Sequence, residues 1–196
     1  MLVNRGFTPR MIGKLEEAIH QRASRIVDEV CERGECEFVE DVAAELPLQV
    51  ICEMIGVPES DRRMVFDWSN KLVGFDDPYF RTSEEQGKEA AAEIYAYCDA
   101  IADDRRANPR DDIMSALVHA EVDGDRLTRE ELDMFFVLLV VAGNETTRNL
   151  IAHSMLALVE HPDARRDLMA DPGLLPVATE EMLRWGCSIQ NFRRTA

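Results

Sequence analysis

The chain has 196 residues, of which 46% are hydrophobic, so it can form one or two domains with a substantial core. Acidic residues outnumber basic ones by 38 to 22, and the net charge of −16 argues against a nucleic-acid or anionic-membrane surface as the general partner. The five cysteines form no Cys-x-x-Cys pair and no signal peptide or membrane-length apolar run is present, so we expect a soluble cytoplasmic protein without disulfides or a zinc site.

The first half of the chain carries mostly helical periodicity. Thr8-Pro9 is a good helix start, and apolar residues at helical spacing predict one helix to about Arg33-Gly34. A short extended piece is expected around Cys36–Val39. Three more helices follow, over about 46–55 up to Gly56-Val57-Pro58, from Ser60 to Gly74, and from Ser83 to about Arg106.

The second half is also helical and contains the longest predicted helix. After a helix from Asp111-Asp112 to His119, Thr128 and Glu131 form a capping box that begins a helix reaching His161-Pro162. Two short helices then precede a terminal strand, over about 162–170 and 176–185. The predicted fold class is therefore mainly α with minor β.

Polar residues interrupt the longest helix at Ala142-Gly143-Asn-Glu-Thr-Thr147. A glycine costs about 1 kcal/mol against alanine inside a helix, and buried polar groups need partners, so this insertion indicates a site. Its small residues allow something flat to approach, and an acid beside an alcohol, Glu145 and Thr146, can relay protons. A helix-packing notch with a surface glutamate explains the same residues equally well.

Two further polar patterns lie near the C-terminal end. Glu181 and Arg184 stand three residues apart on one helix face, a spacing that many solvated helices share. Arg193 and Arg194 lie in the predicted terminal strand, where alternation directs one of them inward toward an anion. An exposed basic strand end accounts for them as well.

The order of these motifs resembles a known family. An apolar helix with AGNETT, a helix beginning at His161-Pro162, EEMLRW about forty residues after AGNETT and a strand with FRRTA together resemble the cytochrome P450 superfamily of haem-thiolate monooxygenases, in its soluble bacterial form. The resemblance extends from FTPR near the start through HAEVDGDRLTREEL before the long helix. It implies a partial cytochrome P450 fold over residues 1–196, with a central long helix and the Glu-x-x-Arg helix.

The resemblance implies roles for the residues around the polar insertion. Ala142 and Gly143 would form the groove over a haem where oxygen binds, and Thr147 would support that groove. Glu145 and Thr146 would be the acid and alcohol that deliver protons for cleavage of the O–O bond.

Further residues acquire roles by the same resemblance. Glu181 and Arg184 would be the structural ion pair of the family, and Arg193 would bind a haem propionate. The residues expected to line the substrate side are Leu138, Val141 and Ile189.

The chain also departs from the family pattern. The loop with the axial cysteine lies beyond the Glu-x-x-Arg helix in the family, so we expect none of the five cysteines to bind the iron and regard the chain as roughly the middle half of a member. A haem-binding His and Arg of the family precede the segment that matches FTPR, and Ser188 stands where relatives usually have proline. Without the thiolate, we expect this part alone to be inactive and prone to association.

The resemblance implies a small apolar substrate, a steroid or a branched-lipid chain end, with O2 as cosubstrate. The slightly basic ends of the chain suggest a ferredoxin-type, acidic iron–sulfur electron donor. Two alternatives stay open: a non-catalytic helical module that binds a lipid or a partner, and a structural helical domain in which AGNETT serves packing.

Overall fold

The computed structural model describes residues 9–74, 82–121 and 124–189, which form eight α-helices and no strand. The helices are α1 (Pro9–Arg33), α2 (Glu45–Ile55), α3 (Arg62–Val73), α4 (Glu84–Ala107), α5 (Ile113–Val118), α6 (Arg129–Glu160), α7 (Pro162–Ala170) and α8 (Leu175–Trp185). Three short segments complete the described elements, namely the π-helical η2 (Val39–Ala43) and the 3-10 helices η3 (Glu59–Asp61) and η5 (Pro172–Leu174). The predicted helices are all present, while the predicted terminal strand lies mostly outside the described residues.

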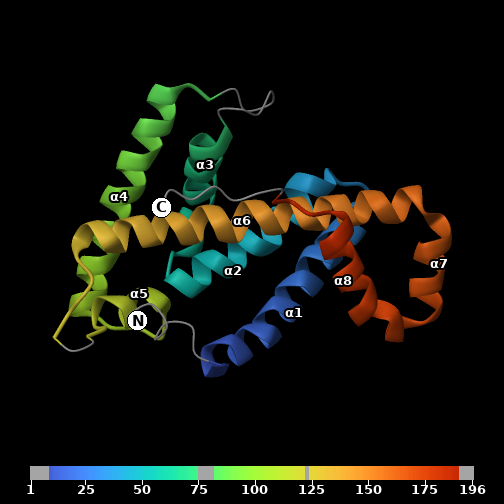
Figure 1. The fold of residues 1–196 in the computed structure, drawn as a ribbon, viewed down its shortest axis with the longest axis horizontal. Helices are drawn as coiled ribbons and strands as arrows, with labels where there is room; N and C mark the ends of the chain where they lie inside the picture. The colour runs from blue at the N-terminus through green and yellow to red at the C-terminus, as the bar shows by residue number, and fades with distance from the viewer. Residues whose placement is uncertain (1–8, 75–81, 122–123, 190–196) are drawn as a thin grey trace, which may run out of the picture.

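Helix α6 crosses the whole molecule, and the other helices are arranged around it (Figure 1). Helix α2 packs along its middle, α3 packs against α4 and meets α6 near the middle of α6, and α4 packs against α6 at one end. At the opposite end α7 and α8 fold back from the end of α6 (Figure 1). Helix α6 is therefore in contact with α2, α3, α4, α7 and α8.

One face of α6 belongs to the hydrophobic core. Leu132, Phe136 and Val140 follow one another at four-residue spacing and are almost fully buried. Burying each such side chain contributes about 1.5–3 kcal/mol, so this face fixes α6 against its neighbours. Although α6 has 32 residues, neither it nor any other helix in the described ranges is long and apolar enough to cross a membrane.

The predicted start of α6 is confirmed atom by atom. The Thr128 hydroxyl accepts the Glu131 backbone N–H at 3.2 Å, and the Glu131 carboxylate accepts the Thr128 backbone N–H at 2.8 Å. These bonds satisfy two of the backbone donors that a helix start leaves free. The bonds that the Glu131 carboxylate accepts from the Thr128 backbone N–H and from the Thr128 hydroxyl lower the pKa of Glu131 from its ordinary value.

The predicted extended piece at Cys36–Val39 is wrong at its end, because Phe38 is already helical and Val39 begins η2. Carboxylates within the segment explain the difference. The Asp41 side chain accepts the Glu37 backbone N–H, and the Glu37 side chain accepts the Glu40 backbone N–H, both at 2.9 Å. Local acceptors of this kind favour a helical start over a strand.

A buried ion pair joins the ends of three helices. Arg105 near the end of α4 donates from Nε to Asp112 Oδ2 at 2.6 Å and from Nη2 to the Gly56 carbonyl at 2.8 Å. Asp112 also caps α5 by accepting the Ser115 backbone N–H at 2.7 Å. Gly56 ends α2 in the left-handed region at φ +83°, which a residue without Cβ adopts most easily. This network fixes the end of α2, and with it the helix that packs behind the middle of α6.

Candidate functional site

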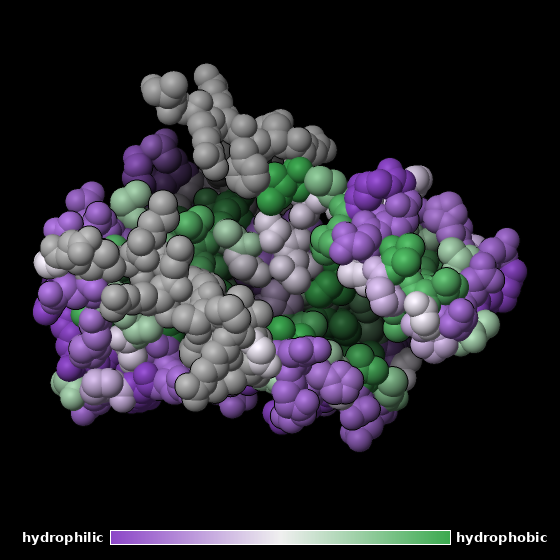
Figure 2. All heavy atoms as spheres, turned by 60° about the horizontal axis from the view of Figure 1, so that its bottom comes forward, coloured by the Kyte–Doolittle hydropathy of each residue, from purple (hydrophilic) through white to green (hydrophobic). Residues whose placement is uncertain are grey.

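An apolar stripe on α6 faces away from the core. Met134 is 59% exposed, Leu138 is 56% exposed, and Ala142 one turn later is exposed too. Figure 2 shows apolar side chains gathered in a hollow at the middle of one face, with polar side chains at both ends. Large exposed apolar surface of this kind marks a place where another group packs. The stripe therefore provides a wall for a flat apolar ligand.

Thr146 lies one turn beyond Ala142 and ends this stripe. Its hydroxyl donates a hydrogen bond to the Ala142 carbonyl oxygen at 2.8 Å, a back bond of the kind that can bend a helix. The helix nevertheless remains α-helical through this turn. The hydroxyl is thus held next to the open face, where it can donate to a ligand by exchanging one partner for another.

Glu145 precedes Thr146 and is held by two side chains that follow it in α6. Arg148 Nη2 lies 2.5 Å from Glu145 Oε2, and Asn149 Nδ2 donates to Oε1 at 3.1 Å. Arg148 is buried and also donates from Nη1 to Asn70 Oδ1 of α3 at 3.0 Å. Sequence reasoning missed Arg148, and its three-residue spacing from Glu145 on an otherwise apolar helix was the available signal.

Gly143 faces α2, whereas Ala142 lies on the open face of α6. A Cβ added at Gly143 would lie 3.2 Å from Cδ1 and 3.3 Å from Cγ1 of Ile51 in α2. Gly143 is therefore the place where α2 closes on α6, which is what the packing alternative expects. Ala142, by contrast, stays on the open face, so the two readings of the motif apply to different residues. The roles of both residues toward a cofactor stay predictions.

The remaining predicted residues of α6 are spread around the helix. Val141 is partly buried and Thr147 is exposed. Their assignments to the substrate side and to the groove stay predictions. Ile189 is 39% exposed, whereas Arg193 lies outside the described residues, as does Arg194.

Glu181 and Arg184 form a forked ion pair on α8. Arg184 donates from Nε to Glu181 Oε2 at 2.7 Å and from Nη2 to Oε1 at 2.6 Å. The hydrogen bond from Arg184 lowers the pKa of Glu181, and the same contact raises that of Arg184. Both side chains are more than half exposed, so the pair stands on the surface with its geometry already set.

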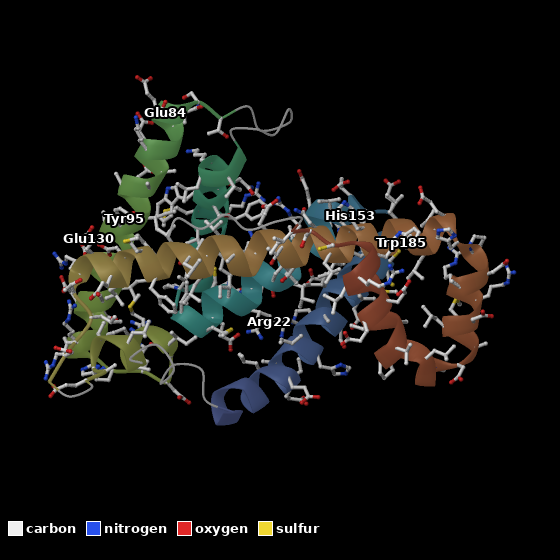
Figure 3. All side chains as sticks on the ribbon, viewed as in Figure 1. Arg22, Glu84, Tyr95, Glu130, His153 and Trp185 are labelled. Carbon is white, nitrogen blue, oxygen red and sulfur yellow. The ribbon has the colours of Figure 1, made fainter. Side chains whose placement is uncertain are left out.

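A second hollow of about 510 Å³ lies between the end of α6, α7 and α8. Its walls include His153 on α6 and Trp185 on α8, which are labelled in Figure 3. The Trp185 ring also stacks edge-on against His161, with centroids 6.2 Å apart. This hollow borders Glu181, so the ion pair sits at the edge of an apolar groove.

Comparison with known proteins decides what kind of fold carries this site. The family model described as cytochrome P450 matches residues 16–171. The chain belongs to the cytochrome P450 family. A methyl-branched lipid omega-hydroxylase of Mycobacterium tuberculosis is 44% identical over 198 residues, which cover 99% of this chain and 46% of the relative. A steroid C26-monooxygenase of Rhodococcus jostii is 46% identical over 196 residues, which cover 100% of this chain and 40% of the relative.

Solved cytochrome P450 structures share the fold. CYP268A2 of Mycobacterium marinum, solved in complex with pseudoionone, has a TM-score of 0.87 and 41% identity over 94% of this chain and 46% of its own. The LnmA hydroxylase of Streptomyces atroolivaceus also has a TM-score of 0.87, with 36% identity over 93% of this chain and 46% of its own. The predicted family and fold are thus confirmed, and the chain spans less than half the length of these relatives.

Membership of the cytochrome P450 family implies a haem cofactor, and the open face of α6 fits one. The uncovered side chains of Met134, Leu138 and Ala142 supply the apolar wall that a macrocycle needs, and Thr146 adds a hydroxyl at its end. Cys52 and Cys98 are buried in the core, and burial raises the pKa of both thiols, that of Cys52 to about 12. These two thiols therefore do not fit the iron-ligand role, and the expectation that none of the five cysteines binds the iron stays a prediction.

Proposed function

We propose that this chain forms the oxygen-binding side of a haem monooxygenase that hydroxylates an apolar substrate, a steroid or a methyl-branched lipid. The observation that carries the proposal is the open apolar stripe of α6, which ends at a carboxylate and a hydroxyl on adjacent residues. The names of two relatives, methyl-branched lipid omega-hydroxylase and steroid C26-monooxygenase, support the substrate class. The activity and the substrate belong to the whole protein.

The chain contributes an apolar wall and a route for protons. Bound haem would supply oxygen activation with electrons from a donor. We assign Leu138, Val141 and Ile189 to the substrate side, where the exposed Leu138 side chain would exclude water once a ligand covers it. The small side chain of Ala142 leaves room for oxygen between α6 and the haem. Thr146 would donate a proton from its hydroxyl toward the open face, and Glu145 would replace that proton.

The remaining assignments complete the proposal. We assign Gly143 and Thr147 to the walls of the groove and Arg193 to a haem propionate. Glu181 and Arg184 would hold structure at the far side of the cofactor. A ferredoxin-type electron donor and a cytoplasmic location are part of the same proposal.

Two measurements on the haem-loaded protein that carries this sequence test the proposal. Under carbon monoxide the reduced protein should show the Soret band of thiolate-ligated haem. Absence of that band would favour the alternative, a helical lipid-binding or interaction module without redox chemistry.

The second measurement is the ratio of hydroxylated product to O2 consumed, with a steroid or a methyl-branched lipid as substrate. Thr146→Ala should lower this ratio because it removes the hydroxyl from the open face. Thr179→Ala is the matched control, since the Thr179 hydroxyl makes the same bond to a carbonyl four residues earlier, at 2.8 Å, but on α8. Equal ratios in both variants would remove Thr146 from the proton route.

A further inference from the structure

Two adjacent residues of α3 bond to the functional turn of α6. Asn144 Nδ2 donates to the Ser69 hydroxyl at 3.5 Å, and one turn later Arg148 donates to Asn70 Oδ1 at 3.0 Å. All four side chains are buried. Buried hydrogen bonds between helices depend on distance and angle, unlike the apolar contacts around them, so a small movement of one helix changes their geometry. The position of α3 is therefore linked to the turn that carries Glu145 and Thr146.

Arg148 connects Asn70 of α3 to the carboxylate of Glu145. Its guanidinium uses Nη1 for Asn70 and Nη2 for Glu145, so one planar group spans both partners. The arginine side chain is only 8% exposed, which leaves it few other partners. Because the guanidinium is rigid, a shift of its Asn70 end changes the geometry at its Glu145 end.

A polar hollow of about 790 Å³ lies on the α3 side of this arginine. Asn70 and Lys71 of α3 and Arg148 and Asn149 of α6 are among the residues that line it. Asn149 is also the second residue that holds the Glu145 carboxylate. The hollow therefore reaches both side chains that hold the Glu145 carboxylate, Arg148 and Asn149, whereas the Thr146 hydroxyl lies at the open face. The contacts that hold Glu145 thus lie on the α3 side of α6, away from the face that Thr146 uses.

We propose that Arg148 is a positioning residue through which α3 controls the acid of the cytochrome P450 site. With Asn70 in contact, the guanidinium keeps Glu145 paired; when α3 shifts, the guanidinium follows Asn70 and the carboxylate becomes free to turn toward Thr146. This inference rests on the proposed function, and it adds a group outside the acid and alcohol pair.

The first test measures the ratio of product to O2 consumed in the haem-loaded protein. Asn70→Leu should lower this ratio although Asn70 lies on another helix, because a shift of α3 then no longer moves the Arg148 guanidinium, which stays paired with Glu145. Asn70→Asp keeps an acceptor for Arg148 and should preserve the ratio. Arg166→Gln removes an exposed arginine that pairs with an acid three residues away, Asp163, and serves as the control for losing such a pair. A ratio unchanged in Asn70→Leu, or equally low in Asn70→Asp, would overturn the proposal.

The second test does not depend on activity. Rates of unfolding in denaturant are measured for Asn70→Leu, Glu145→Gln and the double variant, since rates remain meaningful when unfolding is irreversible. If Arg148 joins the two residues, the double variant should unfold more slowly than the product of the two single accelerations predicts, by at least about twofold. In an Arg148→Gln background the same comparison should be multiplicative. Multiplicative behaviour in both backgrounds would show that Asn70 only packs α3, and would overturn the link.

The two tests separate this inference from the function on which it rests. If Thr146→Ala does not change the ratio, the proposed proton route fails, while the unfolding rates still decide whether Arg148 links α3 to Glu145. If Thr146→Ala lowers the ratio and Asn70→Leu does not, the proton route stands and the positioning role of Arg148 fails.

Discussion

Replacing Asp112 by asparagine removes a buried charge while leaving the shape of the side chain almost unchanged. Asparagine also caps helices well, so the bond from the Ser115 backbone N–H can persist. What is lost is the negative charge opposite Arg105 Nε, 2.6 Å away. The variant therefore isolates the ion pair from the helix cap.

The expected loss of stability follows from the burial of the pair. The side chains of Arg105 and Asp112 are only 4% and 5% exposed, so the guanidinium would be left buried without its main counter-charge. Breaking such a pair costs about 3–5 kcal/mol. Arg105 keeps the Gly56 carbonyl and the half-exposed Asp104 carboxylate, so we expect the lower end, about 3 kcal/mol. In a chain of this size that lowers the melting temperature by roughly 10 °C.

Thermal and denaturant unfolding of the variant and two companions measure this loss. Asp104→Asn removes a more exposed carboxylate from the same arginine and should cost much less than Asp112→Asn, because solvent screens exposed ion pairs. Arg105→Met combined with Asp112→Asn leaves no buried charge and should recover part of the loss. If Asp112→Asn were no more costly than Asp104→Asn, the buried pair would not hold these helix ends together.

Four other predictions concern folding. Gly56→Ala should destabilise by more than about 2 kcal/mol in chemical denaturation, because its Cβ would lie 2.3 Å from Asp112 Oδ2 at φ +83°. Gly34→Ala, at φ +78° with open space around it, should cost about 1 kcal/mol. Burial raises the pKa of Asp133, so the native state binds this proton more tightly than the unfolded state does and loses stability as the proton leaves. The stability of Asp133→Asn relative to the original protein should therefore grow as pH rises from about 4 to 7. A stability difference that does not change with pH would contradict this. Thr128→Ala should cost about 1 kcal/mol through the lost cap of α6, whereas a change within error would show that the cap adds nothing.

Local signals were enough to predict most of the helices. The capping box of Thr128 and Glu131 predicts the start of α6 from four consecutive residues, and the structure contains both of its reciprocal bonds. The exception at Cys36–Val39 has the same origin, because nearby carboxylates rather than side-chain alternation determine that backbone. Where a few neighbouring residues set the structure, sequence patterns were sufficient.

The candidate site was predictable in its motif but not in its surroundings. The residues Glu145 and Thr146 and the back bond of Thr146 could be read from one helix. The contact of Arg148 with Asn70 joins positions 78 residues apart, and no local pattern reports it. The same holds for Gly143, whose neighbour Ile51 comes from another helix. Long-range packing decided which face of α6 each residue uses.

The close approach of Ile51 to Gly143 has a consequence for how precisely the site is built. Sliding α2 along α6 by one turn would bring Ile51 against Leu139 or Thr147, which carry side chains where Gly143 has none. The two helices therefore fit together in a single axial alignment. That alignment is set by the core itself, so the turn of Glu145 and Thr146 has its place before any ligand arrives.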